Sequence, residues 1–416
     1  MLELWFDFSC PYAYLASRRA NRLGVAIDWR PMLLGGVFRG IGAGDGPMTT
    51  LSPAKARHNL ADMHRWAAAW GEPFRMPAAH PMRTVRALRV LLGLPHARWP
   101  AAIEALYATC WQRAEDITSD AVIRGALGDL DPIELDAAFA TADSPGIKDE
   151  LRQRTDEAIS LGIFGAPGWV LRDRSLLIWG QDRMPWVEAA LAGWDLEAPT
   201  PGGPRPFAPT GRARPGATLD VYLDVASPFG YLALTQLGAF AAMGAEIRLI
   251  PILLGALFRD LGQVDVPLFA MPAAKARYVS LDMQRWARWW GVPFAQPTKF
   301  PQRTVTAQRL ILLAGDFEAA LALALALGRA MWAEGRDLED PATLRTILEH
   351  VGLPIELVEQ TQRPEVKARL VDNTAAARTA GAFGVPTFVV DGKHLFWGQD
   401  RLDQVAMTLA GWEPPP

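Results

Sequence analysis

The chain has 416 residues, of which 50% are hydrophobic and 21% are charged, and its formal net charge is −3. This balance is typical of globular domains and argues against intrinsic disorder. The weak net charge gives no electrostatic signature for nucleic acid or for an anionic membrane surface. No apolar stretch reaches the roughly 18 residues that a membrane-spanning helix needs. We therefore expect neither nucleic acid nor a membrane among the partners.

The cysteine and histidine content excludes further classes. Two cysteines, Cys10 and Cys110, cannot form a disulfide framework and are too few for a structural zinc site. The six histidines show no metal-ligand spacing, so we predict no metal and interpret all six as surface or packing residues. The first residues follow a strand-like pattern and lack the basic segment and apolar run of a signal peptide. We therefore expect a cytoplasmic protein.

The chain is a tandem duplication. Segment 62–74 returns as segment 282–294 with nine of thirteen residues identical. Two shorter motifs, Phe-Gly-x-Pro and Trp-Gly-Gln-Asp-Arg, also occur twice. A repeat of about 200 residues matches a complete domain. We predict domains at residues 1–196 and 217–416, which we call the first and the second copy, joined by a Pro- and Gly-rich linker at residues 197–216.

Both copies predict the same elements in chain order. A short strand leads to a helix that opens at a Cys-Pro pair (10–11) or a Ser-Pro pair (227–228), with proline suited to the first turn. A second strand follows, and helical periods then dominate about 42–160 and about 262–378. Two strands around a turn and a final helix close each copy. This order predicts an α/β protein with two tandem thioredoxin-like domains, each interrupted by a helical insertion.

Four motifs in each copy are similar to one enzyme family. Phe6-Asp-Phe-Ser-Cys-Pro-Tyr-Ala-Tyr-Leu-Ala and Leu223-Asp-Val-Ala-Ser-Pro-Phe-Gly-Tyr-Leu-Ala resemble the opening motif of 2-hydroxychromene-2-carboxylate isomerases. Asp282-Met-Gln-Arg-Trp, Phe383-Gly-Val-Pro-Thr and Trp397-Gly-Gln-Asp-Arg-Leu resemble three further signatures. These isomerases group with kappa-class glutathione transferases in the DsbA-like branch of the thioredoxin superfamily. The resemblance spans nearly all of each copy and implies a DsbA/kappa-transferase-like fold with glutathione as cofactor.

The resemblance implies a catalytic role for Ser227. In the family, this serine begins a helix and hydrogen-bonds the thiol of glutathione. A helix N-terminus offers free N–H groups and a partial positive charge, which favour a thiolate over a thiol. A hydroxyl donor adds a charge-assisted hydrogen bond to the same anion. The alternative interpretation is a serine that only caps the helix.

Cys10 replaces the serine in the first copy. A cysteine at a helix N-terminus is expected to have a depressed pKa and could act as a nucleophile. The second cysteine of a dithiol pair is missing from the motif, and we expect Cys110 in the core because Met331 occupies its position in the second copy. Cys10 as a substitute for serine or as a retired site is as plausible as Cys10 as a redox centre.

The resemblance also implies residues that hold glutathione. In the first copy they are Lys55, Ala166, Pro167, Gln181 and Asp182, and in the second copy Lys275, Val385, Pro386, Gln399 and Asp400. The two prolines match a cis-proline that exposes the backbone of the preceding residue, the Gln-Asp pair holds the γ-glutamyl end, and the lysine meets a carboxylate. The alternatives are a trans turn proline, a helix-capping aspartate and a solvated lysine.

The implied function is a glutathione-dependent isomerase that acts on a small aromatic-derived substrate. The second copy is favoured as the active centre because it keeps the serine and Val-Pro-Thr. One alternative is a glutathione transferase or monothiol disulfide oxidoreductase that uses Cys10, and another is a non-catalytic glutathione-binding module. Because family members often dimerise, we expect the copies to pack as an intrachain pseudo-dimer that is a monomer in solution.

Overall fold

The computed structural model describes residues 1–44, 46, 51–196, 207–264 and 266–415. Each copy is built on a four-stranded sheet, in the order β2-β1-β3-β4 or β6-β5-β7-β8. The strands are β1 (Leu2–Phe6), β2 (Ile27–Pro31), β3 (Gly168–Leu171), β4 (Leu176–Trp179), β5 (Thr218–Leu223), β6 (Glu246–Pro251), β7 (Thr387–Val390) and β8 (His394–Trp397). The first two strands of each sheet are parallel and the other pairs are antiparallel. The predicted tandem thioredoxin-like α/β fold is confirmed.

The helices follow the same order in both copies. The first copy contains α1 (Pro11–Ala20), α2 (Leu34–Gly40), α3 (Pro53–Trp70), α4 (Val85–Gly93), α5 (Trp99–Trp111), α6 (Asp120–Ala126), α7 (Pro132–Thr141), α8 (Pro145–Ser160) and α9 (Met184–Leu191). The second copy contains α10 (Pro228–Leu234), α11 (Leu237–Ala242), α12 (Leu254–Asp260), α13 (Ala273–Trp290), α14 (Val305–Leu313), α15 (Phe317–Trp332), α16 (Pro341–His350), α17 (Leu357–Gln360), α18 (Pro364–Ala380) and α19 (Leu402–Leu409). None of the helices described is long and apolar enough to cross a bilayer. Residues 197–206 of the predicted linker lie outside the described residues.

The helical insertion of each copy holds the loop that precedes the first helix. The indole N–H of Trp111, at the end of α5, donates to the carbonyl of Phe8 at 2.9 Å. The indole N–H of Trp332, at the end of α15, donates to the carbonyl of Val225 at 2.8 Å. Both tryptophans are fully buried, so these hydrogen bonds satisfy carbonyls that water cannot reach. The insertion therefore fixes the position at which α1 and α10 begin.

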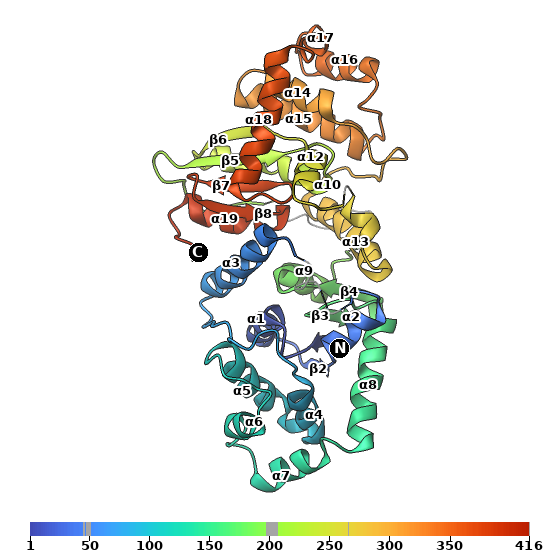
Figure 1. The fold of residues 1–416 in the computed structure, drawn as a ribbon, viewed down its shortest axis with the longest axis vertical. Coiled ribbons are helices and arrows are strands. Elements are labelled where there is room, and N and C mark those ends of the chain that lie inside the picture. The colour runs from blue at the N-terminus through green and yellow to red at the C-terminus, as the bar shows by residue number, and fades with distance from the viewer. Residues whose placement is uncertain (45, 47–50, 197–206, 265, 416) are drawn as a thin grey trace.

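The two copies contact each other through their longest helices. Figure 1 shows the copies stacked along the long axis of the molecule, with α3 and α13 between them. Arg65 of α3 donates to the carbonyl of Leu395 in β8, and Arg285 of α13 donates to the carbonyl of Leu177 in β4 at 2.8 Å. Because β4 and β8 are edge strands, each arginine satisfies a carbonyl that the sheet leaves unpaired. Each long helix thus packs on the sheet of the other copy.

A buried glycine sets the approach of α15 to α10. A Cβ at Gly328 would lie 2.5 Å from the Tyr231 ring, so we expect Gly328→Ala to lower the free energy of unfolding by about 1–3 kcal/mol through overpacking. A Cβ at Gly125 in α6 would meet no other atom within 4 Å, and Gly125→Ala should raise the free energy of unfolding by about 0.5–1 kcal/mol. Urea unfolding monitored by tryptophan fluorescence measures both, and equal effects of the two substitutions would contradict this packing.

Candidate functional site

Ser227 and Cys10 occupy equivalent places at the start of a helix. The Ser227 hydroxyl accepts a hydrogen bond from the N–H of Gly230 at 3.1 Å and donates one to the carbonyl of Val385 at 3.1 Å. The Cys10 thiol donates to the carbonyl of Ala166, also at 3.1 Å. Ala166 and Val385 precede Pro167 and Pro386, and both peptide bonds are cis. The structure therefore brings each predicted sulfur-facing residue against the residue before its cis-proline.

Burial controls the protonation of Cys10. It raises the pKa of the Cys10 thiol to about 12, although the backbone N–H groups of Ala13 and Tyr12 lower it in part. The depressed pKa expected for a cysteine at a helix N-terminus is therefore wrong for this site. Removal of the thiolate from water raises the pKa more than the N–H groups in the first turn of α1 lower it. Cys110 is fully buried, as expected.

A buried aspartate supports each centre, and we did not single it out from the sequence. Asp7 accepts hydrogen bonds from the N–H groups of Ser9 at 3.0 Å and Leu34 at 2.8 Å. Asp224 repeats this pattern with Ala226 and Leu254, both at 2.9 Å. Burial raises the pKa of both carboxyls. The signal was available, because the opening motif of both copies places an aspartate three residues before Cys10 or Ser227.

The predicted lysine of the first copy lies beside the second copy. Lys55 of α3 lies over the Trp397 ring of the second copy, with Nζ 5.3 Å from the ring centroid. Burial, and then the nearby charge of Lys275, lowers the pKa of Lys55 to about 8. Burial also lowers the pKa of Lys275. The sequence assigned Lys55 to the first copy, whereas the structure places its ammonium beside the second, because α3 extends across the interface.

A cluster of charged residues joins the copies at the predicted γ-glutamyl positions. Its members are Arg183, Arg401, Asp62, Asp182, Asp282 and Asp400. Arg401 lies 2.7 Å from both Asp62 and Asp182, and Arg183 lies 3.1 Å from Asp282 and 3.0 Å from Asp400. Burial alone would raise the pKa of Asp400, but Arg401 and Arg183 hold it below its usual value. Four carboxylates face two guanidinium groups, so two carboxylates are in excess.

The glutamines beside this cluster are buried. Gln181 and Gln399 begin the short 3-10 turns that precede α9 and α19, and both are less than 5% exposed. The side-chain nitrogen of Gln181 has no hydrogen-bond partner. The turns themselves pack against α1 and α10, the helices that Cys10 and Ser227 begin. The structure thus brings the predicted Gln-Asp pair next to the helix of its own copy.

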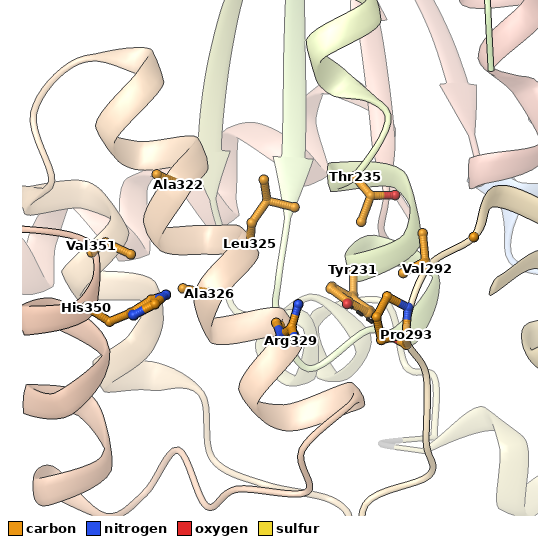
Figure 2. Close-up of a pocket in the computed structure, with 11 residues that line it drawn as sticks. Tyr231, Thr235, Val292, Pro293, Ala322, Leu325, Ala326, Arg329, His350 and Val351 are labelled. Atoms are coloured by element: carbon orange, nitrogen blue, oxygen red, sulfur yellow. Dashed lines mark hydrogen bonds between the residues drawn. The ribbon is translucent and has the colours of Figure 1, made fainter. Parts of the chain in front are cut away.

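A separate hollow of about 350 Å³ borders α10 in the second copy. Figure 2 shows Tyr231 of α10 and Thr235, which follows this helix, on one side of α15, and His350 and Val351 on the other. The lining is mostly apolar, and its arginine, Arg329, forms an ion pair with Glu334 at 3.0 Å. At the equivalent place in the first copy, an arginine forms ion pairs with two glutamates: Arg18 with Glu72 and Glu104, both at 2.9 Å. The two copies therefore differ here in their charged residues.

Comparison with known proteins matches each copy separately. The DSBA-like thioredoxin domain family matches residues 1–192 and again residues 218–410. Glutathione S-transferase kappa 1 of Caenorhabditis elegans is 29% identical over 213 residues, which cover 48% of this chain and 93% of that protein. A 2-hydroxychromene-2-carboxylate isomerase of Pseudomonas putida is 31% identical over 188 residues, 44% of this chain and 90% of that protein. A solved structure of a 2-hydroxychromene-2-carboxylate isomerase is 27% identical with a TM-score of 0.42, and covers 46% of this chain and 94% of that one.

The high pKa of Cys10 can be measured directly. In Cys110→Ser, which leaves Cys10 as the single thiol, we expect the ultraviolet absorbance of the thiolate to appear far above the ordinary cysteine pKa of about 8.5, close to the value of about 12 set by burial. Alkylation by iodoacetamide at neutral pH should be correspondingly slow in the folded protein and fast after denaturation. A Cys10 thiolate at neutral pH would contradict the effect of burial.

Proposed function

Because this chain belongs to the DSBA-like thioredoxin domain family, as a tandem pair of its domains, we propose that it is a glutathione-dependent isomerase acting on a small aromatic-derived substrate. The similarity of about half of the chain to a kappa-class glutathione transferase and to a 2-hydroxychromene-2-carboxylate isomerase supports an enzyme of this kind. The observation that carries the proposal is the Ser227 hydroxyl, which begins α10 and lies 3.1 Å from the carbonyl of Val385.

The residues around Ser227 fit a thiolate. The Ser227 hydroxyl donates a hydrogen bond to the carbonyl of Val385 in the structure. By rotating, it can donate the same hydrogen bond to a sulfur anion that lies beside the start of the helix. The N–H groups in the first turn of α10 add positive potential at this point. When bound, glutathione would supply the thiolate for conjugate addition to the substrate. The substrate would then rotate about the bond that the addition makes single, and glutathione would leave. Ser227 would orient and stabilise the sulfur, and the backbone of Val385 and Pro386 would lie along the cysteinyl part.

The charges of the interface fit the two ends of glutathione. The cluster around Asp182 and Asp400 has two carboxylates in excess, which suits the ammonium of a γ-glutamyl group. Lys55 and Lys275 add positive charge that suits a carboxylate. Gln181 and Gln399 precede Asp182 and Asp400 in turns that pack against α1 and α10, and we propose that each donates an amide hydrogen bond to the cofactor. We propose that these residues hold the cofactor and that the lysine at the Ser227 centre comes from the first copy.

The Cys10 centre supports a second candidate. The kappa-class relative named above is a glutathione transferase and covers a similar share of this chain to that of the isomerase, so we propose a transferase activity at the Cys10 centre, with Ala166 and Pro167, as the alternative. A monothiol disulfide oxidoreductase is less favoured, because Cys10 is buried and its pKa is raised to about 12. Only the thiolate is the attacking form in disulfide exchange. The Ser227 centre therefore remains the leading proposal, and a non-catalytic binding module requires both centres to be inactive.

We further propose a cytoplasmic protein whose copies form an intrachain pseudo-dimer, with domains at residues 1–196 and 217–416. The contacts of Arg65 and Arg285 with the edge strands of the opposite copy support this arrangement. The cluster around Arg183 and Arg401 supports it as well, because buried ion pairs are costly to separate once formed.

Loss of the Ser227 hydroxyl is the direct test. With 2-hydroxychromene-2-carboxylate as the probe, we expect Ser227→Ala to lower kcat/KM about 10- to 100-fold, since a hydrogen bond to a charged group contributes about 1.5–3 kcal/mol. Steady-state kinetics at saturating glutathione measures the change. An equal loss in Cys10→Ala, with Ser227→Ala near wild type, would move the activity to the first copy. No glutathione binding by calorimetry in the wild type would refute the proposal.

The pseudo-dimer predicts the state of the protein in solution. We expect a single chain to sediment as a compact monomer over a wide concentration range. Arg183→Met combined with Arg401→Met removes the two guanidinium groups that contact four buried carboxylates, and should raise the radius of gyration in small-angle X-ray scattering without changing the monomer. A concentration-dependent dimer of the wild type would contradict intrachain pairing, because it would show that the interface also joins separate chains.

A further inference from the structure

His58 is a buried histidine without hydrogen bonds. It lies on α3 of the first copy, and its side chain is 8% exposed. Neither ring nitrogen has a hydrogen-bond partner. The ring packs edge-on against Phe383 at 5.3 Å and Trp397 at 6.3 Å, both in the second copy. A neutral imidazole carries one donor and one acceptor, and buried polar groups of this kind are nearly always satisfied. The interpretation of His58 as an ordinary packing residue is therefore incomplete.

The equivalent residue on the other side of the interface is Tyr278. Its ring packs against Phe164 and Trp179 of the first copy, so it occupies the mirrored place beside the Cys10 centre. The Tyr278 hydroxyl accepts a hydrogen bond from the backbone N–H of Trp179 at 2.7 Å. The phenol is thus tied to the protein, whereas the imidazole of His58 is not. The two centres differ at this position as well as at Cys10 and Ser227.

Other donors lie at the Trp397 ring, against which the His58 ring packs. The indole nitrogen of Trp397 is buried and lacks a partner, and it lies against Gly384, where a Cβ would be only 2.8 Å away. The Lys55 ammonium lies 5.3 Å from the centre of the Trp397 ring. An imidazole, an indole N–H and an ammonium therefore gather on one aromatic ring. Such a set of donors is suited to an anionic oxygen ligand.

The donors lie close to the Ser227 centre along the chain. Phe383, which contacts His58, is two residues from Val385. The carbonyl of Val385 accepts the hydrogen bond of the Ser227 hydroxyl. Two residues of extended chain span at most about 7 Å. A ligand that reaches from the Ser227 hydroxyl along this segment would therefore meet the Trp397 and His58 side chains.

Resting on the proposed glutathione-dependent function, we propose that His58 of the first copy hydrogen-bonds a carboxylate of the ligand held at the Ser227 centre, together with the Trp397 indole and the Lys55 ammonium. This carboxylate belongs either to glutathione or to the substrate. The Cys10 centre has Tyr278 in place of the histidine, so the two centres select different ligands.

The charges around His58 are compatible with this role. Burial lowers the pKa of His58 to about 4, and the charges that face it are of both signs: Asp62 and Asp400 raise the value, whereas Arg401 and Arg65 lower it. His58 is therefore neutral near pH 7, with one N–H available to an acceptor. A negative charge at the ring favours the protonated form, so binding of a carboxylate is expected to raise the pKa of His58.

Calorimetric titration of the full chain tests the proposal. The probes are glutathione and its glycine ethyl ester, and the variants are His58→Phe, which keeps the packing, and His58→Gln, which keeps a donor and an acceptor. If the glycine carboxylate of glutathione is the ligand, His58→Phe weakens glutathione binding at least about tenfold, His58→Gln restores most of the affinity, and the ester binds the wild type and both variants alike. If the γ-glutamyl carboxylate is the ligand, His58→Phe weakens the binding of glutathione and of its ester equally. The Ser227 centre is identified as the signal lost in Ser227→Ala.

If the substrate carboxylate is the ligand, His58→Phe leaves the glutathione affinity unchanged and raises KM for 2-hydroxychromene-2-carboxylate at least about tenfold. Unchanged affinity and KM in a folded His58→Phe would overturn the inference and leave the proposed function standing. No glutathione binding by the wild type would overturn both. Tyr278→Phe is the matched control, because it removes one hydroxyl at the mirrored position and should not change the signal of the Ser227 centre.

Discussion

The structure depends on the charged contact between the copies. Arg183 and Arg401 each hold carboxylates from both copies at 2.7–3.2 Å, in a place where the arginine side chains are at most 12% exposed. Unpaired charges at this depth would cost several kcal/mol each. The cluster therefore fixes the distance between the sheets, and with it the position of α3 and α13 on the opposite edge strands. The shape of each centre follows from that placement.

The two centres share a frame and differ in their chemistry. Each has a helix start, a cis-proline and a supporting buried aspartate, Asp7 or Asp224. The hydroxyl of Ser227 can donate to a sulfur anion without losing its own proton. The thiol of Cys10 is held neutral by burial. The same frame therefore presents a hydroxyl donor at one centre and a protonated thiol at the other.

Sequence reasoning predicted most of what repeats between the copies, although it missed the supporting aspartates Asp7 and Asp224. The sheets, the helix starts at Cys10 and Ser227, and their approach to the residues before the prolines all recur at a nearly constant offset, so each copy supported the interpretation of the other. The offset carries no information about contacts between copies. The placement of Lys55 over Trp397 and of His58 against Phe383 depends on how α3 packs in three dimensions. The high pKa of Cys10 was missed for a related reason, since burial depends on neighbours distant in sequence.

The packing of α3 and α13 on the opposite copies has a consequence for how the sequence can evolve. In a symmetric homodimer, a histidine at position 58 would appear beside both centres, because one gene encodes both helices. Fusion of two copies separates the positions, so that His58 and Tyr278 can vary independently. A change in the first half of the gene then alters the centre encoded mainly by the second half. Variation at position 58 should therefore be compared with the residues that it contacts in the second copy, Phe383 and Trp397, because substitutions at positions in contact are expected to be correlated.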